Sequence, residues 1–280
     1  FYQVRLLAGK SMSDATQQES RAEQREESRR ATIYRVIVSV ALTLISIGQF
    51  NDTKELVSAT YEDVKATFTH EVEYEQLESL NIGRTIPFIE DTFGPPEVIK
   101  TSSYQPEVRF QYYNIEKAII TVFNHNGRVA GFVIVPLVND FIPPQPYRDF
   151  PLAKQPISAA SAGDDGLYLD ASNLLYYAES EDMGKQYLFM QRVIGFVEYG
   201  GLELAVNEVE IDTDIILKEI LALNEYLEAG EEDELVEAIT VFRAAYPPNF
   251  YAYTELDPTL ITESLLTRIE FETYFGGAYD

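Results

Sequence analysis

The chain has 280 residues, of which 46% are hydrophobic, and it carries a net charge of −25 at neutral pH, two histidines and no cysteine. The missing cysteines exclude disulfides, thiolate metal sites and cysteine catalysis, and two histidines are too few for a histidine-rich metal site. The acidity excludes a nucleic-acid surface, which needs clustered lysine and arginine. It is compatible with a cationic partner, divalent ions or a saline exterior, and the alternative is a solvated acidic shell that serves solubility.

The charge is divided unevenly along the chain. Residues 1–50 hold 7 Lys or Arg and 5 Asp or Glu, a net of +2, so the remaining 14 Lys or Arg and 41 Asp or Glu give the rest a net of −27. The acidic surface therefore belongs to whatever folds after residue 51.

Residues 1–30 are polar and predict a disordered cytoplasmic tail, because they cannot bury enough apolar surface to offset ordering. Met12 is a candidate natural start, and residues 1–11 are set aside because the sequence leaves open whether they are native. Residues 31–51 predict a single transmembrane helix, with apolar residues all round its surface. The uncharged part, Val36 to Phe50, has 15 residues, against about 17–25 for a typical span, so Arg35 must snorkel toward the headgroups.

The charges that flank this segment predict its orientation. Basic residues precede it and acidic residues follow it: Arg21, Arg25, Arg29, Arg30 and Arg35, then Asp52, Glu55, Glu62 and Asp63. Because arginine marks the cytoplasmic side, we expect an inner-membrane protein with its N-terminus inside and its C-terminal part outside. The alternative is a buried core helix in a soluble cytoplasmic component of a stress or defence complex.

Three small hydroxyl residues, Ser39, Thr43 and Ser46, fall on one face of the predicted span. Such residues let helices approach closely in lipid, so this face is a candidate for self-association or for a partner helix. The alternative is that they are scattered polar residues without a role.

Residues 52–80 predict a stalk helix. Their apolar residues recur every three or four positions: Val57, Tyr61, Val64, Phe68 and Val72.

Residues 81–138 predict helices packed on an antiparallel β-meander, an α+β arrangement. A short helix at 86–93 ends at Gly94 and two prolines. Strands are predicted at 108–113, 117–123 and 128–135, and Asn126-Gly127 predicts a tight hairpin between the last two.

Residues 80–138 resemble the SmpA/OmlA family of small envelope modules. The resemblance is carried by five segments: Leu80-Asn-Ile-Gly83-Arg-Thr, Ile89-Glu-Asp-Thr-Phe93-Gly94-Pro95-Pro96, Phe110-Gln-Tyr112-Tyr113, Ile120-Thr-Val-Phe123 and Asn126-Gly127-Arg-Val129. It implies a helix–helix–three-strand fold and an accessory binding role in outer-membrane assembly rather than an enzyme. Unlike the family, this chain has no lipoprotein cysteine, and its predicted anchor is uncleaved.

Residues 139–165 are proline-rich and predict a linker to a second α+β unit at 166–280. In that unit the pattern predicts strands at 166–177, 186–199 and 250–254, and helices at 214–227, 235–245 and 258–274. The pattern leaves open whether 81–138 and 166–280 share one core.

No motif in the sequence predicts a catalytic, cofactor-binding or metal-binding residue. His70 and His125 are expected on the rim of a helix and in a hairpin turn. No acidic cluster has the spacing of a calcium loop, and no nucleophile elbow, phosphate loop or dinucleotide fingerprint occurs. A carboxylate-based hydrolase of envelope polysaccharide stays as an alternative function, because paired carboxylates can carry that chemistry.

Adjacent aromatic residues are candidates for a protein interface. Neighbours in a strand point to opposite faces, so one tyrosine of each pair must find a second core or the surface. The candidates are Tyr112, Tyr113, Tyr176, Tyr177, Tyr251 and Tyr253. Together the sequence predicts a single-pass, membrane-anchored, non-catalytic binding protein with no cofactor, whose partners are the membrane and a protein or a second copy.

Overall fold

The computed structural model describes residues 70–163, 165–172 and 174–276, which belong to a compact unit that starts at His70. Three predicted features lie outside these residues: the tail, the transmembrane span with Ser39, Thr43 and Ser46, and the part of the stalk before His70. Within the part of the chain that the structure describes, no helix combines the length and apolar character needed to cross a membrane.

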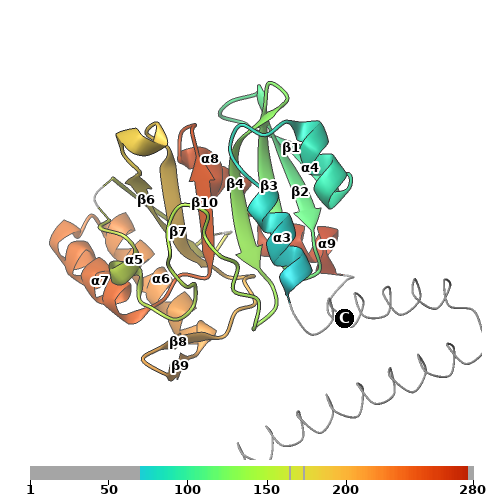
Figure 1. The fold of residues 1–280 in the computed structure, drawn as a ribbon. Coiled ribbons are helices and arrows are strands. Elements are labelled where there is room, and N and C mark those ends of the chain that lie inside the picture. Colours follow the sequence, from blue (N-terminus) through green and yellow to red (C-terminus); the bar gives the residue numbers. More distant parts are fainter. Residues whose placement is uncertain (1–69, 164, 173, 277–280) are drawn as a thin grey trace, which may run out of the picture. The chain divides into compact units, whose positions relative to one another are not determined.

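The fold is α+β, built on one eight-stranded sheet in which every neighbouring pair is antiparallel (Figure 1). The strand order is β1-β2-β3-β4-β10-β7-β6-β5. The strands are β1 (Val98–Thr101), β2 (Val108–Asn114), β3 (Ala118–His125), β4 (Arg128–Pro136), β5 (Gly166–Asp170), β6 (Tyr176–Asp182), β7 (Gln191–Val197) and β10 (Phe250–Thr254). A separate hairpin consists of β8 (Leu204–Val206) and β9 (Val209–Ile211).

Strand β10 joins the two predicted α+β units into one sheet. It pairs with β4 on one side, where Tyr253 lies opposite Phe132, and with β7 on the other, where Tyr253 lies opposite Arg192. Residues 139–165 therefore do not separate two units. They cross the sheet and bury Phe141 and Leu152 in its core.

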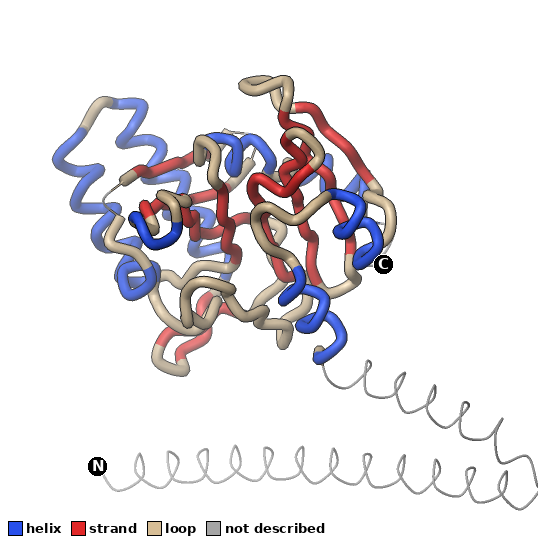
Figure 2. Tube along the Cα trace, turned by 45° about the horizontal axis from the view of Figure 1, so that its top comes forward, coloured by secondary structure: helices blue, strands red, loops and turns tan. Residues whose placement is uncertain are grey.

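Helices cover both faces of the sheet. On one face α3 and α4 lie over the β1–β4 end, while α5, α6 and α7 lie at the β5–β7 end, as Figures 1 and 2 both show. Residues of α8 and α9 pack with the opposite face. The helices are α3 (Glu71–Ser79), α4 (Ile86–Phe93), α5 (Ile157–Ala160), α6 (Thr213–Ala229), α7 (Glu232–Ala245), α8 (Thr259–Ser264) and α9 (Arg268–Tyr274), with a 3₁₀ turn, η1 (Lys185–Tyr187).

Local sequence explains where several of these elements begin and end. Helix α4 has a proline in its first turn and ends at Gly94, whose positive φ of 81° favours glycine. The predicted helix 258–274 is two helices, because Leu265 is extended and Thr267 begins α9 with a capping box closed by Glu270. The predicted strand 166–177 is likewise divided between β5 and β6.

A six-residue repeat marks the two strands that flank β10. Residues 128–133 read Arg-Val-Ala-Gly-Phe-Val and residues 192–197 read Arg-Val-Ile-Gly-Phe-Val. Each copy lies in the last strand of a three-strand meander, β2-β3-β4 or β5-β6-β7. The two copies differ in register against β10, because Phe132 of the first copy and Arg192 of the second both lie opposite Tyr253.

The glycine of each repeat allows a close approach, but to different atoms. A Cβ at Gly195 would lie 2.0 Å from the backbone oxygen of Tyr177, whereas one at Gly131 would lie 2.7 Å from the Phe123 ring and 2.8 Å from the Thr254 hydroxyl. Side chains can shift more readily than paired backbone can, so the two glycines differ in what a substitution costs.

We expect Gly195→Ala to lower the free energy of unfolding by about 3 kcal/mol and Gly131→Ala by about 1 kcal/mol, because overpacking against backbone cannot relax. Gly276→Ala is the control, since its Cβ would lie 3.6 Å from the nearest atom. Denaturant unfolding of the full-length protein measures all three. Equal losses for Gly195→Ala and Gly276→Ala would contradict the predicted packing of β7 on β6.

Candidate functional site

A proline-rich segment lies over the centre of the sheet and encloses a pocket. We call residues 142–151 the strap. Its residues line a pocket of about 450 Å³, a size that suits a small ligand or an inserted side chain. The lining is mostly proline and aromatic, with Arg148 and Asp149 as its charged members.

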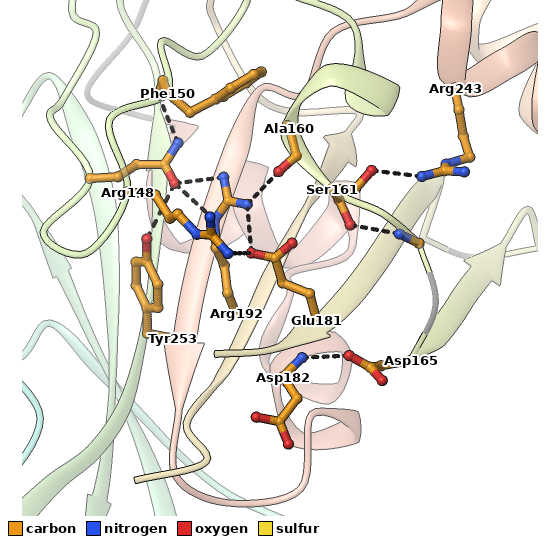
Figure 3. A network of polar contacts seen from close by, with 12 residues as sticks. Arg148, Phe150, Ala160, Ser161, Asp165, Glu181, Asp182, Arg192, Arg243 and Tyr253 are labelled. Carbon is orange, nitrogen blue, oxygen red and sulfur yellow. Dashed lines mark hydrogen bonds and ion pairs between the residues drawn. The ribbon is translucent and has the colours of Figure 1, made fainter. Parts of the chain in front are cut away.

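Arg192 of β7 fastens the strap to the sheet, and Figure 3 shows the contacts that converge on its guanidinium. The side chain is 1% exposed. Its Nε and Nη2 donate to Gln145 Oε1 of the strap at 3.1 and 3.0 Å, and its Nη1 donates to the Ala160 carbonyl at 2.8 Å. Because these donors are paired and Glu181 balances the charge, the burial of Arg192 is tolerated.

Glu181 of β6 links this buried arginine to the rim of the pocket. Its Oε1 lies 3.2 Å from Arg192 Nη1 and 3.2 Å from Nη2 of Arg148, whose side chain is 53% exposed (Figure 3). Tyr253 of β10 donates its hydroxyl to Gln145 Oε1 at 3.3 Å, and burial raises the pKa of this tyrosine, which keeps the hydroxyl protonated as a donor.

A second arginine holds the segment that follows the strap. Arg243 of α7 places Nε 2.6 Å from Oε1 of Glu179, a side chain that is 2% exposed, and donates from Nη2 to the Ser161 carbonyl at 2.8 Å. Glu179 also accepts a hydrogen bond from Tyr177. Burial raises the pKa of Glu179, although the bonds from Tyr177, Arg243 and Ser161 oppose this shift.

The carboxylates of Glu179 and Glu181 are both paired with arginine. Glu179 is buried and faces Arg243 of α7, whereas Asp149 is exposed in the strap itself. What faces outward is a pocket lined by proline and aromatic side chains, with Arg148 and Asp149 as its charged members.

An apolar turn projects next to the strap. We use this name for Met183–Met190, which connects β6 to β7. Leu188 is 88% exposed and Phe189 is 62% exposed, and both adopt the left-handed conformation, with φ of 56° and 59°. That conformation costs an L-residue about 1–2 kcal/mol, so the turn keeps two apolar side chains in solvent at an energetic cost.

The strap and the apolar turn meet through aromatic rings. Tyr147 of the strap and Tyr187 of the turn have centroids 5.7 Å apart, and Tyr147 also lies 4.9 Å from the ring of Tyr253. The pocket and the exposed pair are therefore parts of one surface, which we call the binding face.

The tyrosines predicted as interface anchors are buried, which corrects that prediction. Tyr113, Tyr177, Tyr251 and Tyr253 lie in the core beneath α3–α7, and Tyr112 and Tyr176 lie in the core beneath α8 and α9. The physical reason is that helices cover both faces of the sheet, so each member of an adjacent pair finds a core. Tyr251 and Tyr253 contribute indirectly, because their hydroxyls hold Pro144 and Gln145 of the strap.

The two histidines lie apart from the binding face. His70 Nε2 is 3.2 Å from Asp140 Oδ1, and His125 ends β3 beside Asn126. Among the described residues no group of three His, Asp or Glu side chains could hold a metal ion.

Sequence reasoning missed the residues that form the binding face. The apolar run Tyr187–Met190 was assigned to a strand at 186–199, whereas β7 begins at Gln191. Gly184, with its positive φ of 76°, was the local signal for a turn before that strand. No local signal distinguishes buried Arg192 from Arg128, which occupies the same place in the repeat.

Comparisons with known proteins add little to this geometry. No family model matches the chain, and no curated protein matches it. A solved structure of an extracellular protein containing an SCP domain from Bacillus anthracis str. Ames is similar over 70% of this chain and 53% of that one, with 13% identity and a TM-score of 0.28. The similar region spans about half of that protein, and a likeness of this strength informs neither fold nor function.

We expect Arg192→Met to lower the free energy of unfolding by about 3 kcal/mol, because it leaves Gln145 and the Ala160 carbonyl without their donor and Glu181 with one arginine. Arg128→Met is the matched control from the other repeat. Its ion pair with Glu255 is exposed, so we expect a loss below about 1 kcal/mol. Denaturant unfolding of both variants measures the difference, and equal losses would show that the strap is not held by Arg192.

Two carboxylates, buried Glu179 and partly buried Glu270, predict opposite pH dependences. The pKa of Glu179 is raised, so as pH falls through it the native state binds a proton before the unfolded state does, and stability relative to Glu179→Gln should rise. Burial also raises the pKa of Glu270, but bonds from Lys100 and Thr267 outweigh it and lower the pKa.

For Glu270 the unfolded state therefore binds the proton first, and stability relative to Glu270→Gln should fall as pH falls. Unfolding of the three proteins between neutral and acidic pH measures both differences. The same sign for the two variants would contradict one of the two assignments.

Proposed function

We propose that this chain is a single-pass protein of a bacterial inner membrane, with its N-terminus inside, that uses an acidic α+β head outside the membrane to bind a protein partner without catalysis. The finer architecture belongs to the same proposal, namely a transmembrane helix at 31–51 and a stalk at 52–80 ahead of the head.

The placement at a membrane is supported by the charge distribution. The segment from Val36 to Phe50 is uncharged, arginines precede it, acids follow it, and the net charge changes from +2 before residue 51 to −27 after it. An acidic head on the outer side would avoid the anionic lipid surface of the cytoplasmic leaflet.

The binding role is carried by one observation, the exposed pair Leu188 and Phe189 beside the strap pocket. Monomeric proteins seldom expose adjacent large apolar side chains next to a recess, and such surfaces mark interaction sites. The turn also has a strained backbone, which proteins keep mainly where function needs it.

The resemblance of residues 80–138 to the SmpA/OmlA family supports the same role, because the resemblance implies an accessory binding module. This region holds one helix, α4, followed by β1 and the meander β2-β3-β4, and α3 directly precedes it. A carboxylate hydrolase finds less support, since Glu179 and Glu181 face arginines.

Single cysteines can test the placement and the binding together, because the natural chain has none. The experiment labels Ser13→Cys, Val209→Cys and Leu188→Cys with an impermeant maleimide in spheroplasts. We expect Ser13→Cys to react only after lysis and Val209→Cys, 66% exposed on β9, to react at once. Leu188→Cys should react about tenfold more slowly than Val209→Cys until dilution in detergent releases the partner.

Two results would contradict the proposal separately. Labelling of Ser13→Cys in intact spheroplasts would contradict the proposed placement of the N-terminus inside. Failure of Val209→Cys to label in intact spheroplasts would contradict the proposed placement of the head outside. Equal rates for Leu188→Cys and Val209→Cys before and after dilution would remove the binding role of this face.

A further inference from the structure

Helix α3 is held loosely by the rest of the head. Of its nine residues Leu77 alone is buried, and its N-cap, His70, makes no side-chain capping bond. Glu71 and Glu73 suit the helix dipole at the first turn, but the last turn has no basic residue and contains Glu78, whose charge opposes the dipole. Because so little apolar surface is buried, α3 can detach at a small cost while the sheet stays folded.

The first turn of α3 contacts the segment that leads into the strap. His70 Nε2 lies 3.2 Å from Oδ1 of Asp140, and the ring of Tyr74 stacks on the ring of Phe141 with centroids 5.0 Å apart. Asp140 and Phe141 directly precede the strap, and Phe141 is buried in the core. Helix α3 therefore covers the point where the strap begins.

The strap has two fixed points with a tip between them. Gln145 is held from below by Arg192, and its Nε2 donates to the Phe150 carbonyl at 2.9 Å. Residues 146–149, which we call the strap tip, lie between these two points. The residue of the tip that forms an ion pair, Arg148, is 53% exposed, and such pairs contribute little to stability in solvent. The tip can therefore turn about its two ends once its remaining contacts are lost.

The remaining contacts of the tip converge on Tyr147, and one of them comes from the C-terminal end of α3. Tyr147 donates its hydroxyl to Asn81 Oδ1 at 3.4 Å, while its ring packs against the rings of Tyr253 and Tyr187 at 4.9 and 5.7 Å. Asn81 follows α3 and donates from Nδ2 to the Glu78 carbonyl at 3.0 Å, so its position depends on the helix. A chain of contacts therefore runs from α3 through the strap tip to the apolar turn.

We propose that α3 is a latch for the strap tip. While α3 is docked, it holds Tyr147 beside Tyr187 and the strap closes on the sheet. When α3 detaches, Tyr147 loses one side of its seat and the tip opens about Gln145 and Phe150, which stay fixed. The proposal rests on the proposed function, because it names a regulation of the same binding face. Since α3 is the last part of the predicted stalk, a pull on the stalk would act on the latch, and binding to the closed strap would in turn favour the docked helix.

The test measures trypsin cleavage after Arg148 by mass spectrometry, in full-length protein held in a neutral detergent. Cleavage after Lys218, which lies within α6, reports unfolding of the head in the same sample. Because Leu77→Ser removes the buried anchor of α3, we expect it to speed cleavage after Arg148 about tenfold and cleavage after Lys218 less than about twofold. Leu223→Ser is the matched control, since it removes a buried leucine from α6 and should speed cleavage after Lys218 instead.

A cross-link tests the latch in the opposite direction. His70→Cys with Asp140→Cys places two thiols across the first-turn contact, and the natural chain has no cysteine to compete. A short bis-maleimide that joins them should hold α3 docked and slow cleavage after Arg148 about tenfold, relative to the same protein capped with a monofunctional maleimide. The linker should also restore slow cleavage in the Leu77→Ser background, which a misfolded variant could not show.

Three results would overturn the latch. Cleavage after Arg148 could be unchanged in Leu77→Ser, it could rise only in step with cleavage after Lys218, or it could ignore the linker; in each case the strap tip would not depend on α3. These measurements need neither a membrane nor a partner. Their failure would therefore leave the proposed function standing, and the labelling of Leu188→Cys would still test it.

Discussion

The backbone pairing of β10 on both sides is the interaction on which the rest of the head depends. Its five residues lie between β4 and β7, and none of them is exposed. Without this strand the β1–β4 and β5–β7 meanders would each present an unpaired edge at the centre of the molecule. With it, a single sheet has helices on both faces, and alternate residues of β10 enter the two cores.

The binding face follows from this sheet. Tyr251 and Tyr253 project from β10 toward the strap, and Arg192 projects beside them from β7, so the centre of the sheet holds Pro144 and Gln145 in place. Buried Arg192 is costly unless paired, and its pairing with Glu181, like that of the partly buried Arg243 with Glu179, explains why these carboxylates serve packing. The outward surface that results carries the strap pocket beside the exposed side chains of Leu188 and Phe189.

Local signals predicted many elements of this fold but not its organisation. Strand β10 and helix α4 were predicted with the observed bounds, because prolines and glycine delimit them. The union of the two halves rests on pairing between residues more than 100 positions apart, which no local pattern encodes. The repeat shows the limit clearly: Arg128 and Arg192 have nearly identical neighbours, yet one is exposed and the other buried. The prediction that the tyrosine pairs form an interface was wrong for the same reason. Helices cover both faces of the sheet, and this depends on tertiary packing rather than on local sequence.

Native-state hydrogen exchange on the full-length protein tests the central claim most directly, namely that β10 makes one cooperative head on which the binding face is fixed. The account predicts that the amides of Tyr251, Ala252 and Tyr253 exchange only by global unfolding, with the same free energy as the amides of β3 and β7. Exchange of β10 and β5–β7 at a lower free energy than β2–β4 would contradict it, because the two halves would then open independently.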